Sequence, residues 1–182
     1  MIKSFLGTYA PSESLFKASD DIISEYNNIL PEEIITLWYS YGFGNYGRGI
    51  VKIIYPSLYK NNLDFMLKED TKDNIPFMIT GFGDIFYLNN KQEIYLYKIH
   101  YKKKEYCAKS LEEFFKDYIV HNKVMNNELR YNLFNQAINS LGELDNDDIF
   151  NFIPSLRFGG KEQEGYIQKT DAVTAQGLLA GD

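Results

Sequence analysis

The sequence predicts an α+β protein with a mostly antiparallel central sheet, about residues 49–107, flanked by helices, and a smaller C-terminal α/β segment packed on it. Two observations support this fold class. Short β-branched and aromatic runs alternate with turn signals in the middle of the chain, as in an antiparallel meander. Stretches with helical spacing of apolar residues stand before and after that region. A chain of 182 residues also buries enough surface to need no disulfide.

The N-terminal part predicts helices. Residues 12–28 fit one or two short helices that use Leu15, Ile22, Ile23 and Tyr26 as apolar contacts. A clearer helix follows, because Pro31 suits a first turn and the two glutamates after it complement the positive end of the helix dipole. Gly42 ends this helix. Its buried stripe, at i, i+3, i+4 and i+7, is Ile34, Leu37, Trp38 and Tyr41.

The middle of the chain predicts strands joined by short turns. A glycine-rich turn over residues 42–49 leads into a strand over residues 50–55. Residues 57–69 predict a helix and residues 70–74 a polar loop. Strands are then expected over residues 77–80, 84–88 and 93–101, with a glycine bend at 81–83, a turn at 89–92 and a hairpin turn at 102–104 before Tyr106 and Cys107.

The last third begins with a capping box from Ser110 to Glu113, which predicts a helix over residues 111–119. Residues 121–127 are polar and are the best candidate boundary. We therefore divide the chain into residues 1–120 and 121–182, packed as one globular unit. A helix follows, with a face formed by Leu129, Leu133, Ala137 and Leu141. An acidic turn or helix at 145–150, a strand at 153–158, an extended segment at 166–169 and a terminal helix at 171–180 complete the prediction.

Composition restricts the partner and the compartment. The net charge of −6 and pI near 5.0 disfavour direct binding of nucleic acid, and they favour attraction of a basic protein. The single cysteine excludes an internal disulfide and suits a reducing compartment. The apolar run at the start of the chain is too short for a signal peptide. No segment has the ~18 apolar residues of a membrane span. We expect a cytoplasmic protein that is not associated with a membrane.

The motifs of common enzymes and metal sites are weak or incomplete. The glycine pattern at residues 42–47 resembles a dinucleotide-binding loop, but it follows a predicted helix and precedes a strand, the reverse of the required order. Cys107 with His100 or His121 lacks any local signature of a nucleophile and its base. The run at 145–148 lacks the glycine and glutamate of a calcium loop. Lysines and tyrosines over 95–106 fit a hairpin tip better than a single-strand-binding face. We expect no catalytic residue, metal or cofactor.

Two sets of residues are candidates for binding. The first is acidic and predicts contact with a basic partner, although solvated loops explain most such runs. It comprises Asp84, Glu143, Asp145, Asp147, Asp148, Glu162 and Glu164. Asp84 has the further alternative of capping the glycine bend. The second set predicts a small pocket for an anion, and comprises Arg157, Gly159, Gly160 and Lys169.

Three blocks of the sequence also resemble known families. The segment from Leu30 to Tyr46 and the segment from Ile79 to Tyr87 are similar to two blocks of the GAD-like domain family. The tail from Leu141 through Phe152–Gly160 to the last helix resembles the DUF1851 module. The sequence departs from the family pattern at 148–151, where an acidic-Cys-Tyr run is expected, and at Leu88, where an aromatic residue is expected. The first block also resembles the opening of the broader SUKH group of immunity proteins.

The resemblance implies an immunity protein of a type VI secretion system that binds and neutralises a cognate toxin, a basic nuclease effector, by stoichiometric inhibition. The residues themselves leave a small-ligand-binding or sensing domain without catalytic activity as an alternative. An undiscovered hydrolase is a third reading, which predicts loss of function on Cys107→Ala or His100→Ala. The toxin's identity, its contact face and the oligomeric state are left open.

Overall fold

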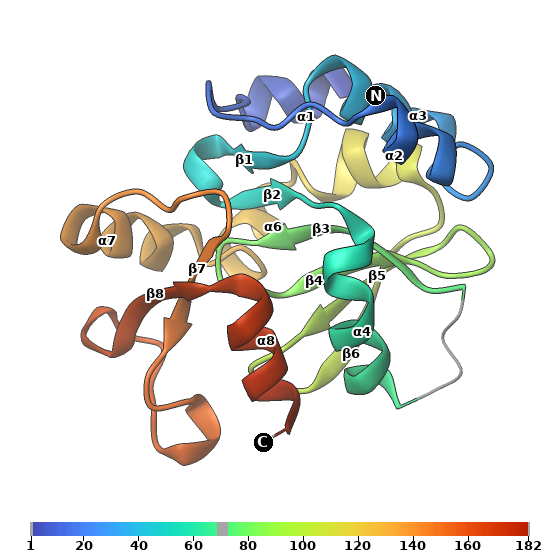
Figure 1. Cartoon of the computed structure of the whole chain (residues 1–182). Helices are drawn as coiled ribbons and strands as arrows, with labels where there is room; N and C mark the ends of the chain where they lie inside the picture. Colours follow the sequence, from blue (N-terminus) through green and yellow to red (C-terminus); the bar gives the residue numbers. More distant parts are fainter. Residues whose placement is uncertain (1, 69–72, 182) are drawn as a thin grey trace.

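The structure, a computed structural model, describes residues 2–68 and 73–181. The predicted loop at 70–74 and the end of the preceding helix at 69 fall partly or wholly outside these residues. The described part contains a six-stranded sheet in the order β1-β2-β3-β4-β5-β6, in which every neighbouring pair is antiparallel, and a separate antiparallel pair β7-β8 (Figure 1). The predicted α+β fold is confirmed.

The described elements are short strands and short helices. The strands are β1 (Gly44–Tyr46), β2 (Val51–Ile53), β3 (Ile75–Thr80), β4 (Ile85–Leu88), β5 (Ile94–Lys98), β6 (Lys103–Ala108), β7 (Asp148–Phe152) and β8 (Ile167–Asp171). The α-helices are α1 (Ile2–Thr8), α2 (Asp20–Tyr26), α3 (Glu32–Ser40), α4 (Pro56–Leu67), α5 (Leu111–Glu113), α6 (Asn122–Asn127), α7 (Tyr131–Leu141) and α8 (Ala172–Gly181). Four single turns complete them: η1 (Gly47–Gly49), η2 (Phe114–Tyr118, a π-helix), η3 (Leu156–Phe158) and η4 (Glu164–Tyr166).

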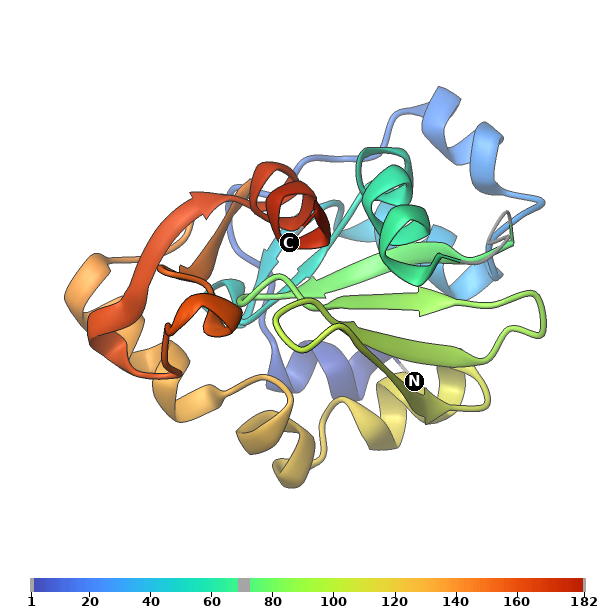
Figure 2. The same ribbon diagram turned by 90° about the horizontal axis from the view of Figure 1, so that it is seen from below.

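Helices cover both faces of the large sheet. Helices α4 and α8 lie on one face, and α1, the α5–η2 segment and α6 lie on the other (Figure 2). Strand β4 illustrates the consequence: Ile85 and Tyr87 pack toward the α4 and α8 cluster, whereas Phe86 and Leu88 belong to the opposite cluster. This alternation follows the two-residue period of a strand. Most of the sheet is therefore an internal layer, whereas β6 keeps Lys103, Lys104 and Tyr106 exposed.

The N-terminal segment differs from the prediction. Helix α2 is shorter than expected and begins after Ser19, whose Oγ accepts a hydrogen bond from Ile22 N. The residues before it are extended along β1, with isolated β-bridges from Pro11 to Tyr46 and from Phe16 to Phe43. The edge strand of a sheet has backbone groups without hydrogen-bond partners, and this segment supplies such partners to β1. Strand β1 itself lies inside the stretch that was predicted as a turn.

The C-terminal part contains the other errors. Residues 153–158 do not form the predicted strand, because the strand is β7, and a cis Ile153–Pro154 bond and η3 follow it. The polar stretch at 121–127 contains α6. The capping box is present, since Ser110 Oγ accepts from Glu113 N at 3.3 Å, but the helix behind it continues as a π-helix. The predicted terminal helix is confirmed as α8.

In the described residues, every helix is too short or too polar to pass through a lipid bilayer.

Candidate partner-binding groove

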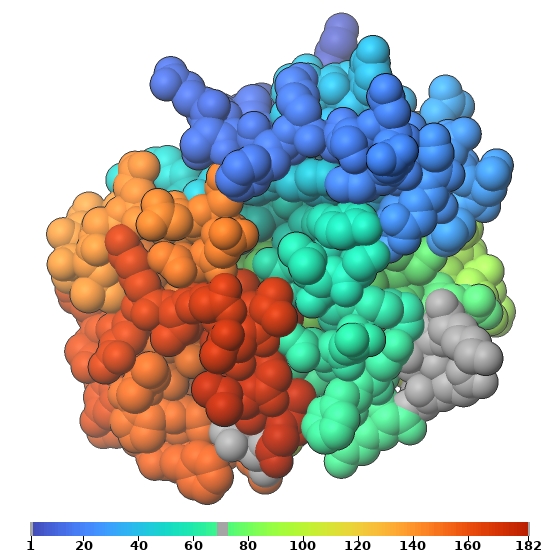
Figure 3. Space-filling view, in the orientation of Figure 1, coloured from blue at the N-terminus to red at the C-terminus, as the bar shows by residue number. Residues whose placement is uncertain are grey.

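A groove of about 220 Å³ opens on the face shown in Figure 3, where the N-terminal segment, α4 and the loop before β7 meet. Its walls are mostly apolar, and two exposed side chains, Phe16 and Leu58, stand at it with 62% and 58% of their surface accessible. The full lining is Phe16, Lys17, Ile22, Phe43, Gly44, Ile53, Ile54, Tyr55, Leu58, Tyr59, Asn146 and Asp147. Residues far apart in the sequence therefore build this one site.

Local sequence rules place these walls. Phe16 is held by its bridge to Phe43, with Phe43 N donating to Phe16 O at 2.8 Å. Helix α4 starts directly after β2 because Pro56 suits a first helical position, and its first turn carries Leu58. Gly44 has a φ of 125°, and a Cβ there would lie 2.5 Å from Asn146 Oδ1. Only glycine lets the loop approach β1 so closely.

The loop that forms one rim, residues 143–148, is acidic. Asp145 and Asp147 are exposed, and Asp148 is half-buried. Asp171 at the end of β8 is near enough that it and Asp147 both act on Tyr59, whose pKa is raised first by burial and then by these carboxylates. Among the described residues, Asp145, Asp147 and Asp148 take part in no ion pair. The rim thus carries negative charge that no ion pair offsets.

A buried lysine holds this loop from below. Lys52 on β2 has no exposed surface, and its Nζ donates to Asn45 Oδ1, to Asp145 O at 2.8 Å and to Asn146 O at 3.4 Å. Burial lowers the pKa of Lys52 to about 7, while the three aspartates of the loop act in the opposite direction. A buried cation is tolerated only where such partners surround it. Lys52 therefore fixes the loop's backbone against the sheet.

Side-chain amides complete the attachment. Asn45 Nδ2 donates to Leu144 O at 2.7 Å, and Asn45 N donates to Asn146 Oδ1 at 3.0 Å. Asn146 Nδ2 in turn donates to Ser14 O at 2.6 Å, which links the loop to the N-terminal segment. The carbonyl of Asp147 accepts from Ala172 N at 2.8 Å. Every carbonyl from residue 144 to 147 is thus engaged, and the acidic loop is preorganised.

A second polar cluster joins the sheet to the C-terminal part. Arg130, at the start of α7, donates from one terminal nitrogen to Asp84 Oδ2 at 2.7 Å and from Nε to Glu162 Oε1 at 2.6 Å. Asp84 Oδ1 also accepts from Ile99 N at 2.9 Å. These contacts raise the pKa of Arg130 against the effect of burial, and they hold that of Glu162 below its ordinary value. His100 stays neutral beside them, because burial lowers its pKa.

The structure separates the acidic residues that the sequence grouped. Glu143, Asp145, Asp147 and Asp148 lie in the groove's loop, where Glu143 pairs with Arg48 at 2.9 Å. Asp84 has no exposed surface, which corrects its expected place on a contact face and leaves the structural alternative. Glu162 is bonded to Arg130, and Glu164 lies exposed in η4. A role in partner binding stays a prediction for the exposed members.

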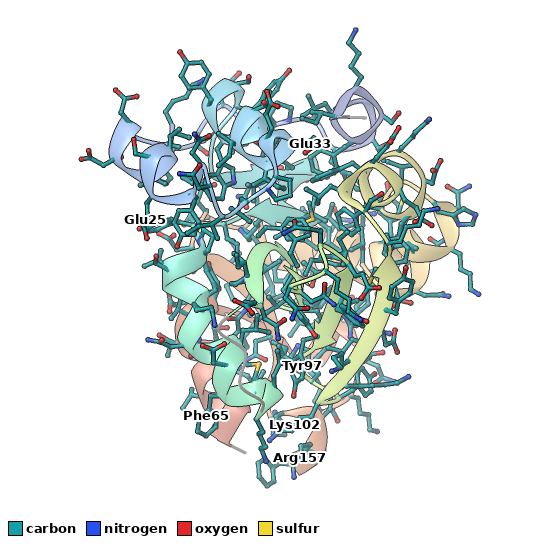
Figure 4. The ribbon with its side chains drawn as sticks, turned by 90° about the vertical axis from the view of Figure 1, so that its right-hand side faces the viewer. Glu25, Glu33, Phe65, Tyr97, Lys102 and Arg157 are labelled. Atoms are coloured by element: carbon teal, nitrogen blue, oxygen red, sulfur yellow. The ribbon has the colours of Figure 1, made fainter. Side chains whose placement is uncertain are left out.

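The residues of the predicted anion pocket do not line one hollow. Lys169 Nζ donates to Glu143 O at 2.5 Å, beside the end of α7. Arg157 instead borders a hollow of about 480 Å³ with His100, Tyr101, Lys102 and Leu156. Figure 4 shows Lys102 and Arg157 at the same end of the molecule. Gly159 ends η3 with a φ of 92°, and Gly160 packs against Pro154 O. These two glycines therefore serve the local turn.

The residues considered for catalysis are not assembled. Cys107 is buried, and burial raises the pKa of its thiol to about 12. Neither histidine bonds to it within the described ranges: His100 Nε2 contacts Phe82 O at 3.0 Å, and His121 caps α6. No group of three His, Cys, Asp or Glu in the described residues is arranged to hold a metal ion.

Some important residues gave little signal in the sequence. Lys52 stands in the β-branched run of a predicted strand, where an alternating lysine ordinarily faces water. Asn45 and Asn146 belong to turn-like stretches that do not announce a long-range contact. Arg130 follows Leu129 with no motif around it. Lys52 offers the clearest sequence signal of these residues, because it is a charged residue inside an otherwise apolar strand.

The protein thus has an α+β fold with a six-stranded and a two-stranded sheet, and its groove places exposed apolar side chains beside an acidic loop. The chain belongs to the GAD-like domain family, whose model matches residues 1–100. Residues 108–181 match the family described as T6SS immunity protein Tdi1, C-terminal. The two matches confirm the resemblance to a type VI secretion immunity protein. The groove draws residues from both matched ranges.

A solved structure supports the fold. The crystal structure of Atu4351 from Agrobacterium tumefaciens superposes with a TM-score of 0.78, covering 99% of this chain and 88% of that one. The two sequences are 18% identical, so this likeness concerns the fold alone. No curated protein sequence matches the chain significantly.

Proposed function

We propose that this immunity protein binds and neutralises a cognate secreted toxin by stoichiometric inhibition, and that the groove face is where the toxin docks. One observation carries the choice of face. The groove is lined by residues of both matched ranges. It combines exposed Phe16 and Leu58 with a loop whose aspartates form no ion pair in the described residues. Aromatic and apolar anchors inside a polar rim are the usual anatomy of such interfaces.

The charge of the face supports a basic toxin. A protein that acts on DNA carries positive charge to meet phosphates, and an acidic face attracts and orients it. We therefore propose a nuclease effector as the partner. A standard interface buries roughly 1,600 Å² in total, more than the groove provides. The contact then extends from the groove over the exposed parts of α4 and of the loop before β7.

The proposed mechanism needs neither turnover nor a cofactor. Occupation of the toxin's active site or DNA-binding surface is sufficient, and the compartment is the cytoplasm, where the toxin's substrate lies. The preorganised loop favours tight binding, because little of the interaction energy goes into ordering it. A nanomolar complex corresponds to about −12 kcal/mol.

The test uses a candidate toxin, a secreted effector that is to be sought among the products of the adjacent genes. Cells that express the effector are protected by the wild-type chain, and the purified proteins form a one-to-one complex in calorimetry. The variant Phe16→Asp/Leu58→Asp is expected to lose both properties with an unchanged melting temperature, because the two side chains are exposed. The matched control is Phe158→Asp, which changes an equally exposed apolar side chain away from the groove.

Two results would contradict the proposal at different levels. Full protection by the groove variant, with loss of protection by Phe158→Asp, would move the docking face elsewhere. Absence of any complex between the wild-type chain and the effector would contradict the immunity function with that partner.

A further inference from the structure

The groove's size limits what it holds. Pockets for drug-sized ligands have volumes of roughly 300–1,000 Å³, whereas this groove measures about 220 Å³. A single long side chain of a partner suits that space better than a cofactor or metabolite. The groove is also open toward the face described above, so that a side chain can enter from a docked protein (Figure 3).

The lining specifies the chemistry of this side chain. Most of the wall is hydrocarbon, supplied by Phe16, Ile22, Ile53 and Leu58 among others. The wall formed by the loop is polar and ends in the exposed carboxylate of Asp147. An apolar channel with a carboxylate at one end matches a side chain with a methylene stem and a cationic head, because lysine and arginine bury the stem and leave the charge at a polar site.

The charges around the groove favour a cation. Asp145 and Asp148 lie on the same loop as Asp147, and Asp147 and Asp171 both act on Tyr59, which lines the groove. Lys52 is the cation closest to them, and it is buried and already bonded to three oxygens. Lys17, which does line the groove, donates from Nζ to Ser40 O at 2.7 Å, at the end of α3. A new positive charge therefore meets carboxylates that form no ion pair among the described residues.

The acidic wall is fixed before the partner arrives. Lys52 and Asn45 bind the loop's carbonyls at residues 144–146, the Asn146 side chain bonds to Ser14 O, and Ala172 N at the start of α8 bonds to Asp147 O. The fold thus keeps the aspartates close together despite their mutual repulsion. A bound cation would reduce this repulsion. We propose that the groove receives one lysine or arginine side chain of the toxin, with its stem between Phe16 and Leu58 and its charge at Asp147.

This inference rests on the proposed function for the identity of the partner, but the groove's chemistry is testable without any toxin. The probe is n-butylguanidinium, and the neutral analogue of the same shape is N-butylurea. Methyl resonances of Ile22, Ile53 and Leu58 report on the walls in an NMR titration. We expect saturable shifts of these methyls with butylguanidinium, and binding about two- to fivefold weaker for butylurea, as for loss of a partly exposed ion pair.

Variants locate the charge. Asp147→Asn is expected to weaken butylguanidinium to the level of butylurea. The matched control is Asp117→Asn, which removes an exposed carboxylate on the opposite side of the sheet and leaves binding unchanged. Equal affinity for both probes, or absence of saturable shifts at the groove methyls, would overturn the proposed slot whatever the toxin does.

The toxin complex supplies the second arm. Asp147→Asn should weaken the complex by about tenfold or more, mainly through faster dissociation, because it leaves a buried basic side chain without its partner. One lysine or arginine of the toxin should be the residue that enters the groove. Its replacement by methionine should weaken the complex with the wild-type chain and should not further weaken the complex with Asp147→Asn. A complex that forms normally with Asp147→Asn overturns the inference and leaves the immunity function standing.

Discussion

Replacement of Arg130 by methionine tests how the two parts of the chain are joined. The Arg130 side chain is 8% exposed and lies between Asp84, which has no exposed surface, and the exposed Glu162. It also lies over the ring of Phe82 at 5.4 Å. Methionine keeps much of the volume and removes the charge. The variant therefore leaves Asp84 buried with its backbone partner, Ile99 N, but without its cation.

The expected loss of stability is large. Breaking a buried ion pair by removal of one partner costs about 3–5 kcal/mol, against a total stability of roughly 5–15 kcal/mol for a domain. With a urea m-value of about 2 kcal/mol/M, the unfolding midpoint should fall by roughly 1.5–2.5 M. The matched control is Arg157→Met, an exposed arginine, whose change should stay within about 0.5 kcal/mol.

Urea unfolding followed by circular dichroism and tryptophan fluorescence measures this loss. Trp38 is a buried residue of α3 that packs against Tyr26 of α2, so that its emission reports the N-terminal part. Because the network crosses between the parts, the two probes should remain coincident in the wild-type chain. The double variant Asp84→Leu/Arg130→Met should recover part of the loss, since no charge then stays buried alone. A loss below about 1 kcal/mol in Arg130→Met would refute the reasoning.

Three further predictions concern the loop and the network. Lys52→Met should speed amide hydrogen exchange in residues 144–148 and weaken toxin binding, because the carbonyls of Asp145 and Asn146 lose their donor; unchanged exchange would contradict the role of Lys52. Gly44→Ala should lower stability by about 1–3 kcal/mol in urea unfolding, since its φ is 125° and its Cβ would meet Asn146, whereas Gly165→Ala, with open space around it, should not. Acid should weaken the ion pair between Arg130 and Glu162. The pKa of Glu162 is lowered in the fold, so the ion pair contributes to the free energy of unfolding above the unfolded pKa near 4.5. This contribution is lost as the pH falls through the folded pKa. A pH titration of the unfolding midpoint should show this loss in the wild-type chain and a smaller one in Arg130→Met.

The antiparallel sheet could be predicted because its signals are local. Runs such as Ile85–Leu88 and Ile94–Lys98 are short, apolar and bounded by turn residues, and these features arise within a few residues of each other. The caps at Ser19 and Ser110 and the first-turn position of Pro56 are equally local. Such elements need no knowledge of the rest of the chain.

The errors occur where a distant segment decides. Strand β1 exists because residues 11–16 and β2 lie on either side of it, and nothing in Gly44–Tyr46 alone favours a strand. The predicted strand at 153–158 failed because the strand that pairs with β8 stops before Pro154. The division of the chain near residue 120 stays a prediction.

The candidate site divides in the same way. Its acidic loop could be predicted, because Asp145, Asp147 and Asp148 form a dense run of one charge. Its apolar half could not, since Phe16 and Leu58 come together only through the bridge to Phe43 and the start of α4. For Asp84 the sequence alone could not decide between an exposed contact residue and a buried partner in an ion pair. Only the position of Arg130 in the fold decides this.

Hydrogen exchange of the chain with and without the adjacent effector tests the central claim most directly, because it maps the docking face without substitutions. We expect protection on binding in residues 14–17, 55–59 and 144–147, which surround the groove. Protection confined to residues 98–106 and 156–164, on the far side of the Arg130 cluster, would contradict the assignment of the groove as the toxin's docking site.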